Sequence, residues 1–117
     1  MFISNGHTII NSNDVRLMQI LSNEIRLYIN ADKFIIIPFG DKDKQEIIRE
    51  ITWRIYSHVL WAEISPQLHV RIDKIQHAYA DGFRLTLDMD TGTIELYHDD
   101  VSAIMQKLIH ETDAFVV

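Results

Sequence analysis

The amino-acid sequence predicts an α+β fold in which an antiparallel sheet, built from two strand-strand-strand-helix halves, has both helices packed on one face. Two stretches are typical of β-hairpins, at 24–39 and 83–98, and apolar and polar residues alternate at 24–30 in the first and along both strands of the second. An extended segment precedes each stretch, and a segment with the periodicity of an amphipathic helix follows it. A shift of 60 residues lays the apolar positions of the first half on those of the second, for example Leu27 on Leu87. The sequence therefore predicts one architectural pattern used twice.

The size of the chain fits one domain. It has 117 residues and a mass of 13.7 kDa, which leaves little room for two independent cores. We expect a single domain over 1–117, with pseudo-repeat halves at about 1–64 and 67–117. Ser65-Pro66 is expected to end the first helix and to join the halves, because a residue before proline avoids the helical conformation.

The first hairpin is predicted from alternation and turn chemistry. Ile25, Leu27 and Ile29 lie on one face of the first strand, with polar residues between them. The turn residues Asn-Ala-Asp-Lys occupy 30–33, and an apolar segment at 34–39 returns as the second strand.

The second hairpin follows the same logic, with alternating strands at 83–89 and 94–98 and a turn at 90–93. The triplet Asp90-Thr91-Gly92 resembles the Asp-Thr-Gly triplet of aspartic proteases. That resemblance ends after three residues, because an ordinary strand resumes directly after the triplet. We therefore expect a hairpin turn in which Gly92 supplies a positive φ.

Two helices complete the halves. The first is predicted over 43–62, with Asp43 and Glu46 at capping-box spacing. It carries two apolar stripes, of which a sheet can cover one. The first stripe consists of Ile48, Ile51, Ile55, Val59 and Ala62, and the second of Trp53, Tyr56, Leu60 and Ile64. The second helix is predicted at about 101–111, where the preceding Asp99-Asp100 favours capping.

Composition narrows the possible compartments and partners. Hydrophobic residues make up 47% and charged residues 24%, which is typical of a globular protein. No apolar run is long enough to cross a bilayer and no secretory signal is visible, so we expect a cytoplasmic protein. The chain has no cysteine, which excludes disulfides and thiolate chemistry. A net charge of −6 with scattered basic residues argues against direct binding to nucleic acid.

Few residues suggest chemistry. If Met89 faces Ile94 across the second hairpin, Asp88 lies opposite Glu95 with Asp90 beside them, which forms an acidic tip. This tip is expected to be solvated, with a hard cation such as Ca²⁺ as the alternative. His98, beside two aspartates, is the nearest approach to an acid/base group. No catalytic residue, cofactor site or metal site is predicted.

The second helical stripe and the strand after the first turn suggest an interface. Both carry apolar residues on a face that one small sheet cannot cover, and exposed apolar patches mark contacts between proteins. We expect these residues to form a twofold homodimer contact. The candidate residues are Trp53, Tyr56, Leu60, Trp61, Ile35, Ile37 and Phe39.

The function predicted from the sequence is a small, cytoplasmic, non-enzymatic interaction or regulatory module. It is expected to bind itself and another protein, but neither nucleic acid directly nor a membrane. Two alternatives remain open. One is an acidic inhibitor or nucleic-acid mimic that acts on a nucleic-acid enzyme, and the other is a small enzyme or ligand binder that uses His98 with Asp88, Asp90 and Glu95.

Overall fold

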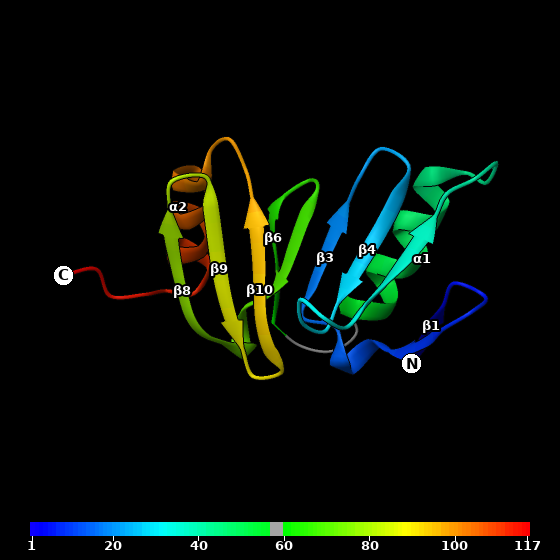
Figure 1. The fold of residues 1–117 in the computed structure, drawn as a ribbon, viewed down its shortest axis with the longest axis horizontal. Helices are drawn as coiled ribbons and strands as arrows, with labels where there is room; N and C mark the ends of the chain where they lie inside the picture. Colours follow the sequence, from blue (N-terminus) through cyan, green and yellow to red (C-terminus); the bar gives the residue numbers. More distant parts are fainter. Residues whose placement is uncertain (57–59) are drawn as a thin grey trace.

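The computed structural model describes residues 1–56 and 60–117 (Figure 1). These residues form antiparallel sheets with two α-helices and two short 3₁₀-helices, so the predicted α+β class is confirmed. The first half contributes β1 (Phe2–Ser4), β2 (Ile9–Asn11), η1 (Ser12–Asp14), β3 (Leu17–Ile20), β4 (Glu24–Tyr28), β5 (Phe34–Pro38) and α1 (Lys44–Tyr56). The second half contributes β6 (Trp61–Ser65), β7 (Leu68–Arg71), η2 (Ile72–Lys74), β8 (Ile75–Asp81), β9 (Arg84–Met89), β10 (Gly92–Tyr97) and α2 (Val101–Glu111).

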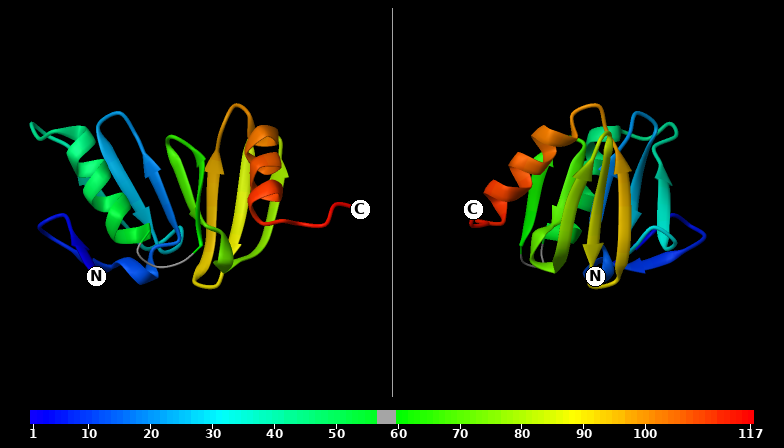
Figure 2. Two further views of the ribbon diagram at one scale, coloured as in Figure 1. Left: turned by 180° about the vertical axis from the view of Figure 1, so that it is seen from behind. Right: turned by 60° about the vertical axis from the view of Figure 1, so that its left-hand side comes forward.

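The described strands form three sheets in layers, as Figures 1 and 2 show. The central sheet has the order β5-β4-β3-β7-β6, so the pairing of β3 with β7 joins the two halves. On one side of it lie α1 and the hairpin of β1 and β2, and on the other lies the sheet β10-β9-β8 with α2.

Each face of the central sheet contributes to a separate apolar core. Side chains alternate along a strand, so Met18 of β3 enters one cluster and its neighbour Leu17 enters the other. The first cluster contains Ile55 of α1, whereas the second contains Ile104 and Leu108 of α2. The expectation that both helices pack on one face of a single sheet is therefore wrong. The strands of the second hairpin form a sheet of their own, and α2 packs there and on β6.

The first helix is shorter than the predicted span of 43–62. Its described part is Lys44–Tyr56, the predicted positions 57–59 lie outside the described residues, and Trp61 and Ala62 belong to β6. The apolar residues of β6 continue the helical spacing of α1 by coincidence. Within β6, Glu63 is exposed between buried neighbours, which is the alternation of a strand. Ser65 ends β6 and the turn to β7 follows it, so the expected joint between the halves is a hairpin turn within the central sheet.

The register of the second hairpin differs from the expected one by two residues, because Met89 was expected to face Ile94. Met89 pairs with Gly92, so only Asp90 and Thr91 form the loop, and Asp88 lies opposite Thr93. Glu95 lies opposite Thr86, away from Asp88, and this corrects the predicted facing of the two carboxylates. Neither loop residue has a positive φ, and the predicted positive φ is found at Gly92, the first residue of β10, where it is 130°.

Candidate functional site

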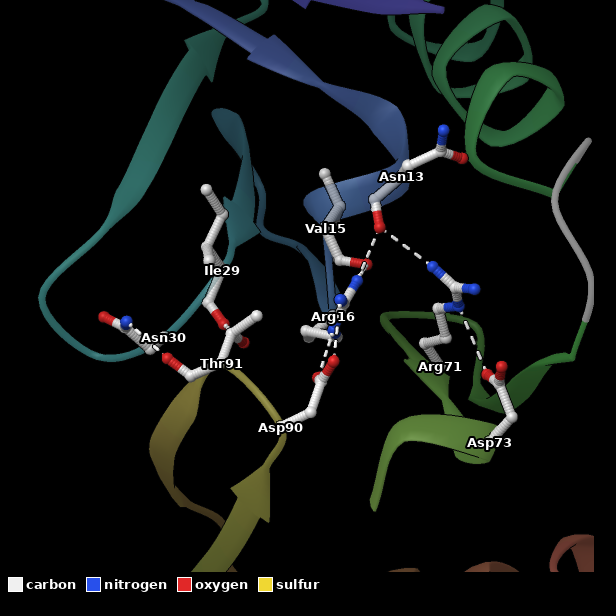
Figure 3. A network of polar contacts seen from close by, with 9 residues as sticks. All are labelled: Asn13, Val15, Arg16, Ile29, Asn30, Arg71, Asp73, Asp90 and Thr91. Carbon is white, nitrogen blue, oxygen red and sulfur yellow. Dashed lines mark hydrogen bonds and ion pairs between the residues drawn. The ribbon is translucent and has the colours of Figure 1, made fainter. Parts of the chain in front are cut away.

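A polar network at the base of the molecule holds the second hairpin against the first half (Figure 3). The Nε of Arg16 donates to Asp90 Oδ1 at 2.6 Å and its Nη2 donates to Oδ2 at 3.1 Å, so the pair is bidentate. The Arg16 side chain is 7% exposed and that of Asp90 is 34% exposed. The hydrogen bond from Arg16 holds the pKa of Asp90 below its usual value. Beside it, the Asn30 amide donates to the Thr91 carbonyl at 2.8 Å.

This network uses Asp90 for structure, so the predicted acidic tip is not one cluster of carboxylates. Asp88 accepts a hydrogen bond from the Thr93 hydroxyl at 2.8 Å and lies 3.5 Å from His77 Nδ1. Glu95 occupies an exposed position of β10. Over 1–56 and 60–117, no three His, Asp or Glu side chains gather closely enough to share a metal ion.

His98 lies in the loop between β10 and α2, where it has a local structural contact. Its Nδ1 accepts from the backbone N–H of Asp100 at 2.9 Å, and the Asp100 carboxylate accepts from the N–H of Ala103 at 3.0 Å. The expected N-terminal cap of α2 is therefore present at Asp100. His98 orders the residues that precede the helix.

The residues predicted to form a homodimer contact divide into buried and exposed sets. Ile35, Ile37, Phe39 and Trp61 are at most 9% exposed and belong to the core around α1, so they are not available to a second chain. β5 turns one face to α1, and the monomer covers that face. Trp53 and Leu60 are 59% and 55% exposed.

Trp53 lies at a groove with a volume of about 920 Å³. One wall is the outer side of α1, including Lys44, Arg49 and Thr52. The other is formed by the β3–β4 loop and the β6–β7 turn, including Ser22 and Gln67. Two cationic side chains and an exposed indole therefore border one groove, and Glu63 is the acidic residue in its lining.

Local contacts fix the walls of this groove. Lys44 Nζ lies 3.4 Å from the Ser22 carbonyl and 5.4 Å from the centre of the Phe39 ring, so the first turn of α1 is held against the β3–β4 loop. Across the groove, the Tyr56 hydroxyl lies 2.7 Å from His69 Nδ1. His69 also hydrogen-bonds the Pro66 backbone, so it connects α1 to the β6–β7 turn.

Burial sets the protonation of this pair. It lowers the pKa of His69 and raises the pKa of Tyr56 to about 12, with Glu63 adding to the second shift. The neutral imidazole then accepts a hydrogen bond from the Tyr56 hydroxyl at Nδ1 and donates one from its other nitrogen to the Pro66 carbonyl.

We expect mild acid to destabilise the protein through His69. The unfolded chain binds a proton near pH 6.5 and the folded protein only at a lower pH. The stabilisation that the neutral His69 contributes is therefore fully present above about pH 6.5 and is lost as the pH falls toward the pKa of His69 in the folded protein. Urea unfolding midpoints measured on both sides of this value should fall with pH. In His69→Gln the same fall should be smaller, and an equally steep fall would assign the effect to another group.

A second hollow of about 290 Å³ lies on the other side of the same loops. It is lined by Gln19, Tyr97, His98 and Ile104, and it shares Leu21 and Gln67 with the α1 groove. Figure 1 shows the β3–β4 loop, the β6–β7 turn and the β10–α2 loop along one edge of the molecule. We call these segments, 21–23, 66–67 and 98–100, the loop edge.

No family model matches this chain, and no curated protein matches it. Among solved structures, the chain is similar to the LytTr DNA-binding domain of a protein described as a methyl-accepting/DNA response regulator from Bacillus cereus. The likeness has a TM-score of 0.50 at 11% sequence identity, and it covers 93% of this chain and 94% of that one. At this identity, the likeness establishes the fold.

This likeness corrects the expected function and partners. The sequence suggested a homodimeric protein-interaction module that does not bind nucleic acid directly. The fold of this chain is instead similar, over 93% of its length, to that of a DNA-binding domain. The expectation drawn from scattered basic residues counted charges along the chain and did not consider where folding places them. Folding brings Lys44 and Arg49 to one groove despite a net charge of −6. No described helix is long or apolar enough to span a membrane.

Proposed function

We propose that this protein binds double-stranded DNA through the loop edge and the α1 groove beside it. The observation that carries this proposal is the fold likeness to a DNA-binding domain over 93% of the chain. A role on DNA also fits the cytoplasmic location expected from the sequence.

The side chains along this edge suit the two kinds of contact that DNA requires. Lys44 and Arg49 in the α1 groove supply positive charge for phosphates. Asn23 is exposed on the β3–β4 loop and Gln67 is exposed on the β6–β7 turn. Side-chain amides can donate hydrogen bonds to base edges in the major groove and accept hydrogen bonds from them. Trp53 adds an exposed ring at the outer wall.

The dimensions of the molecule agree with this arrangement. Its longest extent is 47 Å, and the loop edge follows that direction in Figure 1. One turn of B-DNA is about 34 to 36 Å long, so a protein of this length can follow more than one groove. The loops project from the ends of paired strands, which hold them rigidly.

We expect the double variant Lys44→Glu/Arg49→Glu to weaken DNA binding at least about ten-fold, because two phosphate contacts become repulsive. The slope of the logarithm of the association constant against the logarithm of the salt concentration should become shallower by about two, one for each lost phosphate contact. Fluorescence anisotropy measures both effects on a labelled duplex of about 30 base pairs selected from a random library.

The control is Lys33→Glu, which makes the same substitution as Lys44→Glu, half the charge change of the double variant, in the β4–β5 turn at the other end of β4. It should leave affinity within about two-fold, since its charge lies outside the proposed interface. Equal losses in both variants would show only a general charge effect. Failure of the wild-type protein to retain any duplex at low salt would overturn the proposal.

A further inference from the structure

The two halves of the chain repeat one plan of strand pairing at a spacing of 60 residues. The 3₁₀-helices show it most directly, since η1 covers Ser12–Asp14 and η2 covers Ile72–Lys74. Each is preceded by a hairpin, β1-β2 or β6-β7, and followed by a three-strand meander, β3-β4-β5 or β8-β9-β10. Each meander is followed by a helix. We call these halves unit 1 and unit 2.

The junction between the units is made by one strand edge and one hairpin. The outer edge of β3 in unit 1 pairs with β7 in unit 2, with Leu17 opposite Val70 and Met18 opposite His69. One face of the β6-β7 hairpin packs on its own unit, through Ala62 and Val70. The other face packs on α1 of unit 1, where His69 meets Tyr56 at 2.7 Å.

Trp61 completes that second face. Its ring stacks near Tyr56 with centroids 6.0 Å apart, and it is 9% exposed. The hairpin of unit 2 therefore covers both the edge strand and the helix of the preceding unit.

Unit 2 has the same strand edge, but no described residue pairs with it. β8 corresponds to β3, and its outer edge is the end of the sheet β10-β9-β8 over the described part of the chain. Its side chains at 77 and 79 are exposed, and Ala78 turns to its own core as Met18 does in unit 1. The seven-residue strand carries no lysine or proline, the residues that commonly protect sheet edges from further pairing.

Unit 1 has the complementary hairpin, and two large apolar side chains, Phe2 and Ile9, are exposed on its outer face beside Ser4 and Asn11. Ile3 and Ile10 pack into the core of unit 1, as Ala62 and Val70 do in unit 2. Phe2 lies opposite Asn11 as Trp61 lies opposite Arg71, and Ile9 corresponds to His69. Phe2 and Ile9 are 63% and 69% exposed, whereas Trp61 and His69 are buried by the preceding unit.

We propose that a second copy of this chain adds its β1-β2 hairpin to the outer edge of β8, repeating the junction between units 1 and 2. The register follows from the internal one by a shift of 60 residues. Ala78 lies opposite Ile9 of the second copy, and Tyr79 lies opposite its Thr8. Phe2 and Ile9 of the added hairpin then cover the α2 side of unit 2, as Trp61 and His69 cover α1.

This contact is head-to-tail and differs from a twofold dimer. β8 and the β1-β2 hairpin lie at opposite ends of the molecule, as Figure 1 shows. Each copy therefore keeps one free edge and one free hairpin after pairing, and the arrangement extends to further copies. Main-chain hydrogen bonds supply the attraction and the two apolar side chains supply the specificity.

Disulfide trapping tests the proposal, because the chain has no cysteine of its own. Ile9→Cys and Ala78→Cys are prepared separately, mixed without DNA and oxidised with a glutathione couple. Directly opposed residues of antiparallel strands have Cα atoms about 4.5 to 5.5 Å apart, within the range that a disulfide spans. The mixture should form a covalent dimer at least about ten-fold faster than a mixture of Ile9→Cys with Ile36→Cys. Ile36 lies on β5, an edge strand of the central sheet.

The remaining outcomes decide the orientation of the contact. A double variant with both cysteines should give a ladder of covalent oligomers, since the contact does not close on itself. The pair Tyr79→Cys and Thr8→Cys repeats the test at two exposed positions that do not affect the core. Faster trapping with Ile36→Cys, trapping of Ile9→Cys alone, or no trapping with either opposed pair would overturn the proposal. Because no DNA is present, these outcomes are independent of the proposed DNA binding.

Discussion

Leu27→Ala and Leu87→Ala are each expected to lower the free energy of unfolding by about 2 to 5 kcal/mol. Both side chains have no exposed surface, and they lie in the separate cores on either side of the central sheet. Removing three side-chain carbons there loses apolar burial and leaves a cavity that a close-packed interior fills only in part. Urea unfolding followed by circular dichroism measures both changes.

We expect both variants to unfold in a single transition, because β3 of one half pairs with β7 of the other. Phe115→Ala is the control, since Phe115 is 89% exposed, and its effect should stay within about 0.5 kcal/mol. A variant in which one core melts first, while the other keeps its wild-type midpoint, would contradict the coupling of the two cores.

The features of this fold that the sequence predicts are those set by local patterns. The alternation of Leu85 and Leu87 with polar neighbours identifies β9, and Gly92 identifies the turn after it. The capping aspartate at Asp100 identifies the start of α2. These signals depend on residues within a few positions of one another.

The layer arrangement depends on contacts between distant residues, which these patterns do not report. Trp61–Ser65 is spaced so that it continues the stripe of α1, yet it forms a strand because β7 pairs with it. The pairing of β3 with β7 joins residues about 50 positions apart, and it divides the apolar residues into two cores. Tertiary pairing overrides the local periodicity there.

The candidate site could not be predicted for the same reason. Lys44 and Arg49 lie on one helix, but Ser22 and Gln67 reach the groove from two distant loops. A count of charges gives −6 and does not show that basic residues of α1 face these loops. Lys44 and Arg49 are five residues apart, which is about 140° around an α-helix, so their spacing did not indicate a shared face. Basic residues on a helix are by themselves typical of any solvated helix.

Asp90→Asn is expected to lower the free energy of unfolding by about 1 to 3 kcal/mol, because it leaves the Arg16 guanidinium without its anionic partner. Arg16 lies between η1 and β3, and its backbone also joins β4 and β7 through Tyr28 and Arg71. The hairpin loop at Asp90 therefore docks on the point where the two halves meet. Thr91 strengthens this docking through its hydroxyl, which donates to the Ile29 carbonyl at 2.5 Å.

Asp88→Asn is the matched control, since it makes the same change in the same hairpin. Asp88 is partly exposed and contacts Thr93 and His77, so its effect should be below about 0.5 kcal/mol. The pH dependence separates the two carboxylates further. Because the pKa of Asp90 is lowered in the folded protein, its contribution is present above the unfolded value of about 3.8 and is lost as the pH falls below it. The free energy of unfolding of Asp90→Asn should therefore fall less steeply with decreasing pH than that of the wild type. Two results would show that the Arg16–Asp90 pair does not hold the halves together: an equally steep fall in Asp90→Asn, or an equal loss of stability in Asp88→Asn.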